Sequence, residues 1–124
     1  MTVISKKSVA KIWHDKAMNL SQDALVLQLT GQTGFLEMYA EAFEYEQKSA
    51  LFYVDMFDKE PTRAVLFRSA ASLAIQCHKF SDAERLIALG LSGNPPKLIT
   101  TELKALQEQI KTQFANPTFQ IRNL

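Results

Sequence analysis

The 124-residue sequence predicts an all-α fold in which helices pair as antiparallel hairpins. Apolar residues recur every three or four positions through most of the chain, which places them on one face of a helix. Glycine and proline residues gather in a few short stretches that separate these periodic segments. No segment shows the alternation of apolar and polar residues that is typical of a strand. We therefore expect five helices joined by short turns.

The first helix is expected over residues 8–29, because Val9, Trp13 and Leu20 belong to one apolar face. Ser21 could instead begin a separate helix, since a serine hydroxyl accepts a hydrogen bond from the amides of the following turn. The phase of the apolar residues does not change across Ser21, and this favours one continuous helix.

A turn at residues 31–34 leads to the second helix, expected over residues 35–57, whose outer face carries Glu37, Glu41 and Glu44. Its last two turns, residues 50–57, are apolar almost all round. Such a helix end has to be covered by another helix pair or by another chain.

Pro61 suits the first turn of a third helix, which is expected to end near Cys77. Proline has no amide hydrogen, but in the first turn of a helix that hydrogen would have no partner within the helix. Ser81 and Glu84 have the spacing of a capping box, which predicts the start of a fourth helix that ends near Leu91. Gly93 is expected to stop this helix in a left-handed conformation. A fifth, amphipathic helix is expected over residues 97–113, and the tail at residues 114–124 has no helical period.

Residues 64–97 resemble a tetratricopeptide repeat, whose pattern is an aromatic residue, a leucine, a small residue and a tyrosine, then A-x3-F, then a proline. The matching residues are Phe67, Ala70, Ala71, Ala74, Phe80, Ala83, Ile87 and Pro95. Ala74 in place of the tyrosine and His78 in place of the usual turn glycine are departures from the pattern. The chain is similar in this region to small bacterial tetratricopeptide-like proteins.

Residues 17–50 resemble a degenerate first repeat, whose two helices disagree in phase by one residue. This difference predicts a shortened turn between Gly31 and Phe35. The matching residues are Ala17, Leu20, Ala24, Leu27, Gly31, Tyr39, Ala42 and Phe43.

The resemblance implies one domain, residues 1–124, built as a short right-handed superhelical array. It would consist of a degenerate helix pair (8–57), a better-matching pair (62–93), a capping helix (97–113) and the irregular tail.

The resemblance also implies a concave groove that binds a peptide segment of a partner protein. The residues that it assigns to this groove are Met18, Leu25, Gln28, Val65, Arg68, Ser72, Ile75 and Gln76, and Ser21 lies in the same rank. Arg68 would be the one fixed charge, suited to an acidic side chain or a free C-terminus of the peptide. Alternatively, Arg68 forms an internal salt bridge with the acidic second helix.

No catalytic, cofactor or metal site is expected. Cys77 and His78 are adjacent on a helix, so their side chains diverge by about 100° and cannot form a nucleophile–base pair. His14 is the only other histidine, and no Cys-x-x-Cys or His-x-x-x-His spacing supplies a zinc ligand set. Phosphate-binding glycine motifs and the G-x-S-x-G nucleophile motif are missing too.

Composition excludes several other classes. The chain is 47% hydrophobic and 22% charged, which is ordinary for a globular protein. Residues 1–62 carry a net charge of −3 and residues 63–124 a net charge of +4, and neither half has the basic and aromatic clustering of a nucleic-acid groove. No apolar run is long enough for a membrane span, and the N-terminal lysines precede no signal-like apolar segment. The single cysteine favours a reducing, cytoplasmic location.

Two functions remain open. The first is a non-catalytic interaction module that binds a peptide in the groove. The second is self-association as a homodimer through Trp13 and the apolar residues 50–57, favoured because two repeats are fewer than the three that usually stabilise an array.

Overall fold

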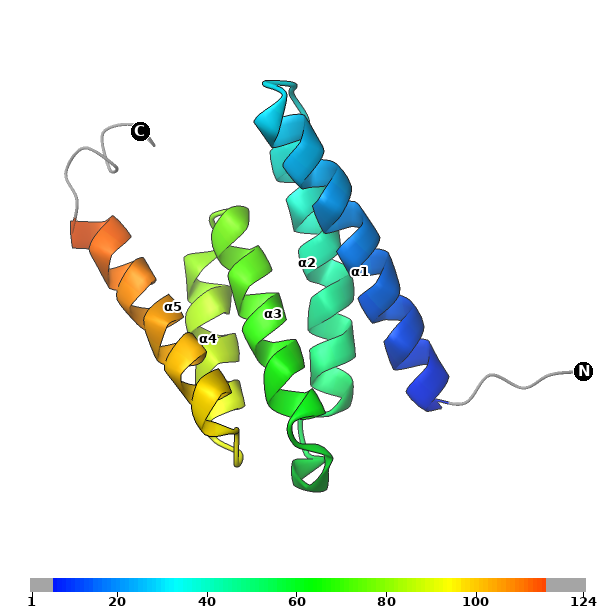
Figure 1. Cartoon of the computed structure of the whole chain (residues 1–124), viewed down its shortest axis with the longest axis vertical. Helices are drawn as coiled ribbons and strands as arrows, with labels where there is room; N and C mark the ends of the chain where they lie inside the picture. Colours follow the sequence, from blue (N-terminus) through cyan, green and yellow to red (C-terminus); the bar gives the residue numbers. More distant parts are fainter. Residues whose placement is uncertain (1–5, 116–124) are drawn as a thin grey trace, which may run out of the picture.

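The computed structural model describes residues 6–115 of the chain, and these residues form five α-helices, one short 3₁₀-helix and no strand (Figure 1). The predicted all-α class is therefore confirmed. The helices are α1 (Lys6–Leu29), α2 (Phe35–Phe52), α3 (Thr62–Gln76), α4 (Phe80–Leu91) and α5 (Lys97–Ala115), and the 3₁₀-helix η1 (Phe57–Lys59) precedes α3.

Each helix packs against its neighbour in the sequence, and α3 also packs against α5. Figure 1 shows α1, α3 and α5 in the nearer layer, with α2 and α4 behind them. The odd-numbered helices therefore share one face of the molecule. Because α1 and α2 are longer than α3 and α4, their hairpin extends past the turn that joins α3 to α4 (Figure 1).

Small residues at seven-residue spacing allow the helices to approach closely. Ala10, Ala17 and Ala24 on α1 are at most 1% exposed, and Ala64 and Ala71 on α3 are fully buried. Phe43 and Phe67 supply the largest apolar side chains of the same core. The core is completed from α4 and α5 by Ala83, Leu86, Ile87, Ile99, Leu103 and Ile110.

The first helix is continuous, as the phase of its apolar residues predicts. Ser21 lies inside α1, where its hydroxyl donates to the carbonyl of Met18 at 3.0 Å. The serine therefore bonds back along its own helix and does not begin a new one.

The first helices of the two hairpins, α1 and α3, end in the same way. Gly31 has φ 70° and His78 has φ 63°, both in the left-handed region. In each case the amide of this residue and the amide of the next residue donate hydrogen bonds to carbonyl groups in the last turn of the helix. The N···O distances are 3.3 and 2.9 Å after α1, and 3.0 and 2.7 Å after α3. This pattern is a Schellman motif. Gly31 and His78 are 47 positions apart, the same offset that relates Ala17 to Ala64 and Ala24 to Ala71.

The turn between the paired helices differs from the prediction. Residues 30–34 join α1 to α2, whereas only residues 77–79 join α3 to α4. The first turn is thus the longer one, and the predicted shortening is wrong. The extra residues end in Gly34, whose φ of 91° is again left-handed.

The second helix ends at Phe52, five positions before the predicted Phe57. The amides of Tyr53 and Val54 bond to the carbonyls three residues earlier, which tightens the chain and ends the helix. The carbonyl of Val54 then accepts a hydrogen bond at 2.9 Å from Nε of Arg63. A side chain nine positions away thus satisfies the backbone where the helix stops.

Two predictions about α4 are wrong. The helix begins at Phe80 after Lys79, without a side-chain cap, so Ser81 lies within the first turn and the predicted capping box does not form. Gly93 is not in the left-handed region; α4 ends at Leu91, and the next residue, Ser92, has a right-handed conformation. The fifth helix runs to Ala115, two residues past its predicted end, and the rest of the predicted tail lies outside the described residues.

Candidate functional site

The eight predicted groove residues differ widely in their exposure to solvent. Leu25, Gln28 and Gln76 are exposed, whereas Met18, Val65, Arg68 and Ser72 are half-buried. Ile75 is only 5% exposed and belongs to the hydrophobic core, so it offers little area to a ligand. Gln28 is engaged within its own hairpin, where its side-chain oxygen accepts a hydrogen bond from the Tyr39 hydroxyl at 3.1 Å.

Arg68 forms an ion pair with Glu102 of α5. This partner is neither a ligand nor an acidic residue of α2, the two possibilities that the sequence left open. The side chains of Arg68 and Glu102 remain 30% and 38% exposed. Because water reaches both groups, their attraction is screened and adds at most about 1 kcal/mol to stability.

The ion pair borders a pocket of about 320 Å³ between α3 and α5. The pocket is lined by Arg68, Ser72, Glu102, Ala105 and Leu106. It combines an apolar wall from α5 with a hydroxyl group, a guanidinium and a carboxylate. Two of the predicted groove residues therefore meet, but their neighbours come from α5 and not from α1.

The sequence analysis missed a buried polar cluster where α1, α2 and α3 meet. The carboxylate of Glu46 is fully buried and accepts hydrogen bonds from Ser69 and from His14, whose Nδ1 lies 2.9 and 3.0 Å from the two carboxylate oxygens. Burial raises the pKa of Glu46 above its usual range, and the bonds to Ser69 and His14 partly offset this increase. A sequence signal existed: Glu46 occupies a position of the apolar stripe of α2, between Phe43 and Ala50.

This cluster stabilises the helix junction and does not activate a nucleophile. In a hydrolytic triad the imidazole lies between the hydroxyl and the carboxylate, so that it can remove the hydroxyl proton. Here the carboxylate of Glu46 lies between the imidazole of His14 and the hydroxyl of Ser69. Both groups satisfy the buried carboxylate.

A second buried charge, Arg63, lies where the chain passes from α2 through η1 to α3. Its side chain is 1% exposed, and its guanidinium carbon lies 4.6 Å from the ring centre of Phe57 and 5.1 Å from that of Phe67. Gly93 leaves room for this group, because a Cβ there would come within 2.6 Å of Nη1. Arg63 therefore connects η1, α3 and the loop between α4 and α5.

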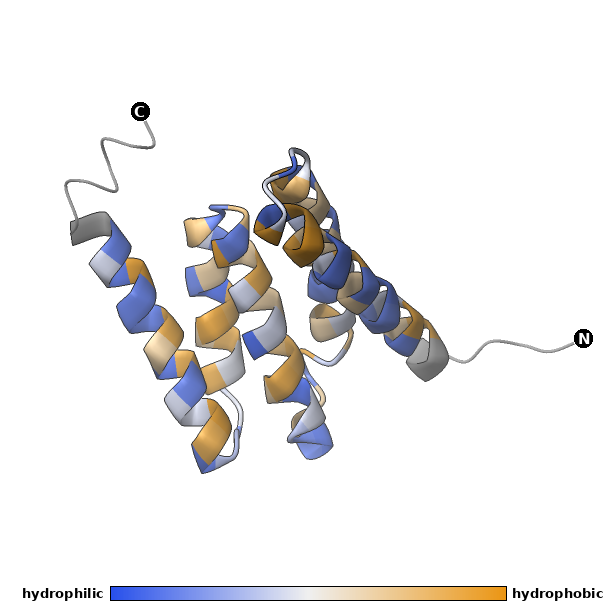
Figure 2. Cartoon of the chain, turned by 45° about the horizontal axis from the view of Figure 1, so that its top comes forward, coloured by the Kyte–Doolittle hydropathy of each residue, from blue (hydrophilic) through white to orange (hydrophobic). Residues whose placement is uncertain are grey.

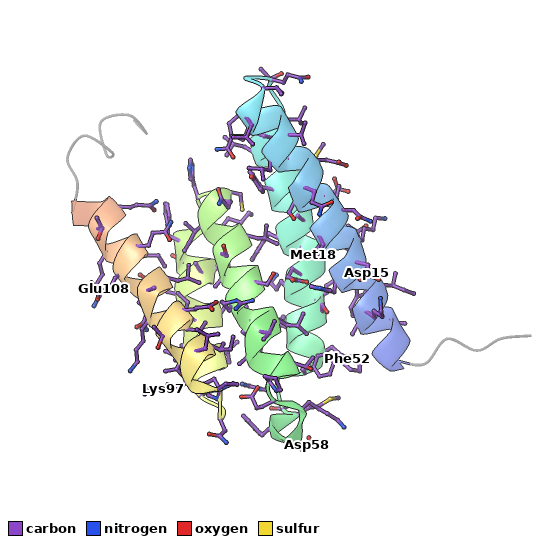
Figure 3. The ribbon with its side chains drawn as sticks, viewed as in Figure 1. Asp15, Met18, Phe52, Asp58, Lys97 and Glu108 are labelled. Carbon is purple, nitrogen blue, oxygen red and sulfur yellow. The ribbon has the colours of Figure 1, made fainter. Side chains whose placement is uncertain are left out.

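Glu60 binds the same loop beside Arg63. One of its carboxylate oxygens accepts a hydrogen bond at 2.9 Å from the amide of Ala64, in the first turn of α3. The other oxygen accepts a hydrogen bond at 3.0 Å from the amide of Asn94. Figure 3 labels Asp58 of η1 and Lys97 of α5 at this end of the molecule. Both contacts are structural, since each oxygen satisfies a backbone amide.

Cys77 is half-buried at the end of α3, with Sγ 3.5 Å from the carbonyl oxygen of Ala74. Burial raises the pKa of this thiol, so it stays protonated at neutral pH and is a poor nucleophile.

Within residues 6–115, no three His, Cys, Asp or Glu side chains gather as a metal site would require. No helix of the same residues is long and apolar enough to cross a membrane. No protein-family model, curated protein or solved structure matches the chain.

Proposed function

We propose that the chain is a non-catalytic interaction module of tetratricopeptide-like architecture, which binds a peptide segment of a partner protein on the face formed by α1, α3 and α5. The observation that carries this proposal is the pocket between α3 and α5, which joins an apolar wall to the half-exposed pair of Arg68 and Glu102. The lone cysteine is consistent with a role in the reducing cytoplasm.

The internal repetition supports an array of stacked helical hairpins, with an offset that is longer than the about 34 residues of a tetratricopeptide repeat. The same offset of 47 positions relates the buried alanines of α1 and α3 and the left-handed residues that end both helices. Antiparallel hairpins with alternating helices in two layers are the building units of such an array. In this proposal α5 is the capping helix, with Leu103 and Ile110 covering the last hairpin.

The pocket has the chemistry to bind an extended peptide. Arg68 donates hydrogen bonds and Glu102 accepts them, so together they match the carbonyl and amide of a peptide backbone. A carboxylate of the peptide has to displace Glu102 before it can pair with Arg68. That contact is worth about 1.5–3 kcal/mol if the complex excludes water, and under about 1 kcal/mol if the pair stays wet.

A displayed library of random peptides, some with free C-termini, tests the proposal. We expect enriched peptides to carry a carboxylate, to lose binding about tenfold or more with Arg68→Ala, and to bind more tightly to Glu102→Gln, in which no internal carboxylate competes. Lys104→Ala, an exposed change on α5, is the matched control and should leave binding unchanged. Enriched peptides that bind equally to Arg68→Ala would contradict the pocket as their site.

Self-association is the second candidate function, and the exposed side chains at the end of α2 and in η1 favour it. Leu51 and Phe57 are 37% and 52% exposed, which leaves apolar area free in the monomer. Ala50 and Tyr53, however, are already buried within the chain, so only part of residues 50–57 is available. Light scattering over a range of concentrations separates this candidate from a monomeric module.

A further inference from the structure

Apolar side chains gather at the free end of the α1–α2 hairpin. Among residues 9–113, whose side chains the structure describes, eight large hydrophobic side chains are markedly exposed, and four of them lie here: Leu25, Val26, Leu29 and Leu36, at 47%, 57%, 76% and 41%. We call these four residues the hairpin tip. Figure 2 shows hydrophobic residues gathered at this end of the hairpin. An exposed apolar group of this kind marks an interaction surface.

The tip is exposed because the hairpins differ in length. At about 1.5 Å per residue, the 24 residues of α1 span about 36 Å and the 15 residues of α3 about 22 Å. Figure 1 shows the α1–α2 turn beyond the end of α3. The last turns of α1 and the first turn of α2 therefore have no third helix beside them.

The charge around the tip has one sign. From Ala17 to Gln47 the chain contains no Lys, Arg or His, while Asp23, Glu37 and Glu41 are exposed. The two bases that flank this segment, Lys16 and Lys48, both lie over the ring of Tyr45, at 4.8 and 5.8 Å from its centre.

The carboxylates lie beside the apolar side chains along the helices. Asp23 precedes Val26 by three positions on α1, and Glu37 precedes Glu41 by four positions at the start of α2. Residues three or four apart are neighbours on a helix, so Asp23 lies beside the apolar Val26, and Glu37 and Glu41 share one acidic face of α2. Glu41 extends the acidic margin by one turn of α2.

We propose that the hairpin tip binds a basic amphipathic helix of a partner protein. Its apolar side chains would cover Leu25, Val26 and Leu29, and its Lys or Arg residues would pair with the flanking carboxylates. A second copy of this chain is a poor occupant, because a symmetric contact places each acidic tip against another. The proposal is independent of the pocket between α3 and α5, which prefers the opposite charge.

Two synthetic helical peptides of about 14 residues, about four turns, test this proposal. They share one pattern of leucines and carry either lysine or glutamate at every polar position. We expect the Leu/Lys peptide to bind by fluorescence anisotropy and to shift amide NMR signals of residues 23–41. Affinity should fall when ionic strength rises from about 0.01 to about 0.15 M, as the Debye length shortens from about 30 to about 8 Å.

Matched variants locate the contact. Leu29→Ser should raise the Kd of the Leu/Lys peptide about tenfold or more. The double change Glu37→Lys with Glu41→Lys should raise it by a similar factor. Leu98→Ser and Glu108→Lys, exposed changes on α5, should leave binding unchanged. All five positions are exposed, so circular dichroism should show an unchanged fold.

Three results would overturn the proposal: equal binding of the Leu/Glu peptide, equal loss with the α5 controls, or a dimer in light scattering that Leu29→Ser dissociates. The last would identify a second copy as the occupant. Arg68→Ala should not affect the Leu/Lys peptide, so a failure at the tip is distinguishable from a failure of the proposed function.

Discussion

His78 holds a backbone conformation that glycine normally provides. Its φ of 63° repeats the conformation of Gly31 at the matching place in the other hairpin. A residue with a Cβ loses about 1–2 kcal/mol in the left-handed region, because the Cβ approaches the following carbonyl oxygen. The imidazole of His78 stacks on the ring of Phe80, with 5.9 Å between ring centres, and this contact offsets part of that loss.

Substituting His78 separates these two effects. We expect His78→Gly to be more stable than His78→Ala by about 1 kcal/mol, because both lack the ring and only glycine relieves the backbone strain. Urea unfolding followed by circular dichroism measures the difference. Gly31→Ala is the reciprocal control: nothing lies within 4 Å of the added methyl group, so its expected loss of about 1 kcal/mol is purely conformational. Equal stability of the two His78 variants would refute strain at this turn.

At the scale of the helices, the repetition shows where α1 and α3 differ in polarity. With the offset of 47 positions, Asn19 and Asp23 of α1 correspond to Leu66 and Ala70 of α3. Leu66 and Ala70 are buried, whereas Asn19 and Asp23 are exposed. The two helices therefore differ here: α1 presents polar side chains to solvent at the positions where α3 buries apolar ones.

Close approach between α3 and α4 gives a prediction for Ala71. Ala71 of α3 and Ala83 of α4 are both fully buried, and these two helices pack against each other. We expect Ala71→Leu to overpack this contact and lower the free energy of unfolding by about 1–3 kcal/mol. The control is Ala88→Leu, which adds the same atoms at an exposed position of α4 and should change stability by less than about 0.5 kcal/mol. A wild-type melting temperature for Ala71→Leu would show that the helices do not pack closely there.

The sequence predicts the helices well because periodicity and turn residues are local signals. It fails where a contact between distant residues decides the outcome. The end of α2 depends on Arg63 reaching the carbonyl of Val54, and no property of residues 50–57 alone reveals this bond. Likewise, Arg68 pairs with Glu102 because α5 packs on α3, and this arrangement is not encoded in the spacing around either residue.

At the scale of the whole molecule, two buried charges join the hairpins. Glu46 of α2 connects α1 and α3 through His14 and Ser69, and Arg63 of α3 bonds to the chain just after α2. These contacts and the packing of α2 on α3 cross the boundary between the hairpins, so separating the hairpins would break the hydrogen bonds and expose apolar core side chains to water. We therefore expect all the helices to unfold in one transition, and Trp13 in α1 reports on the first hairpin while circular dichroism reports on every helix.

The raised pKa of Glu46 makes this joint stability depend on pH. The folded chain keeps the Glu46 proton at pH values where the unfolded chain, with its ordinary pKa of 4.5, has lost it. Stability from this group is therefore present below pH 4.5 and is lost as pH rises toward the folded-state pKa, by up to about 1.4 kcal/mol per pH unit. Glu46→Gln keeps a side chain that can hydrogen-bond to Ser69 and His14 but cannot ionise, so its free energy of unfolding should fall less steeply between pH 4.5 and neutrality. Urea titrations at several pH values, followed by Trp13 fluorescence and circular dichroism, measure how the free energy of unfolding of the wild type and of Glu46→Gln depends on pH. The control is Glu37→Gln, which changes an exposed acid on the same helix and should show the same pH dependence as the wild type. If Glu46→Gln also follows the wild type, Glu46 does not couple proton binding to the packing of the hairpins.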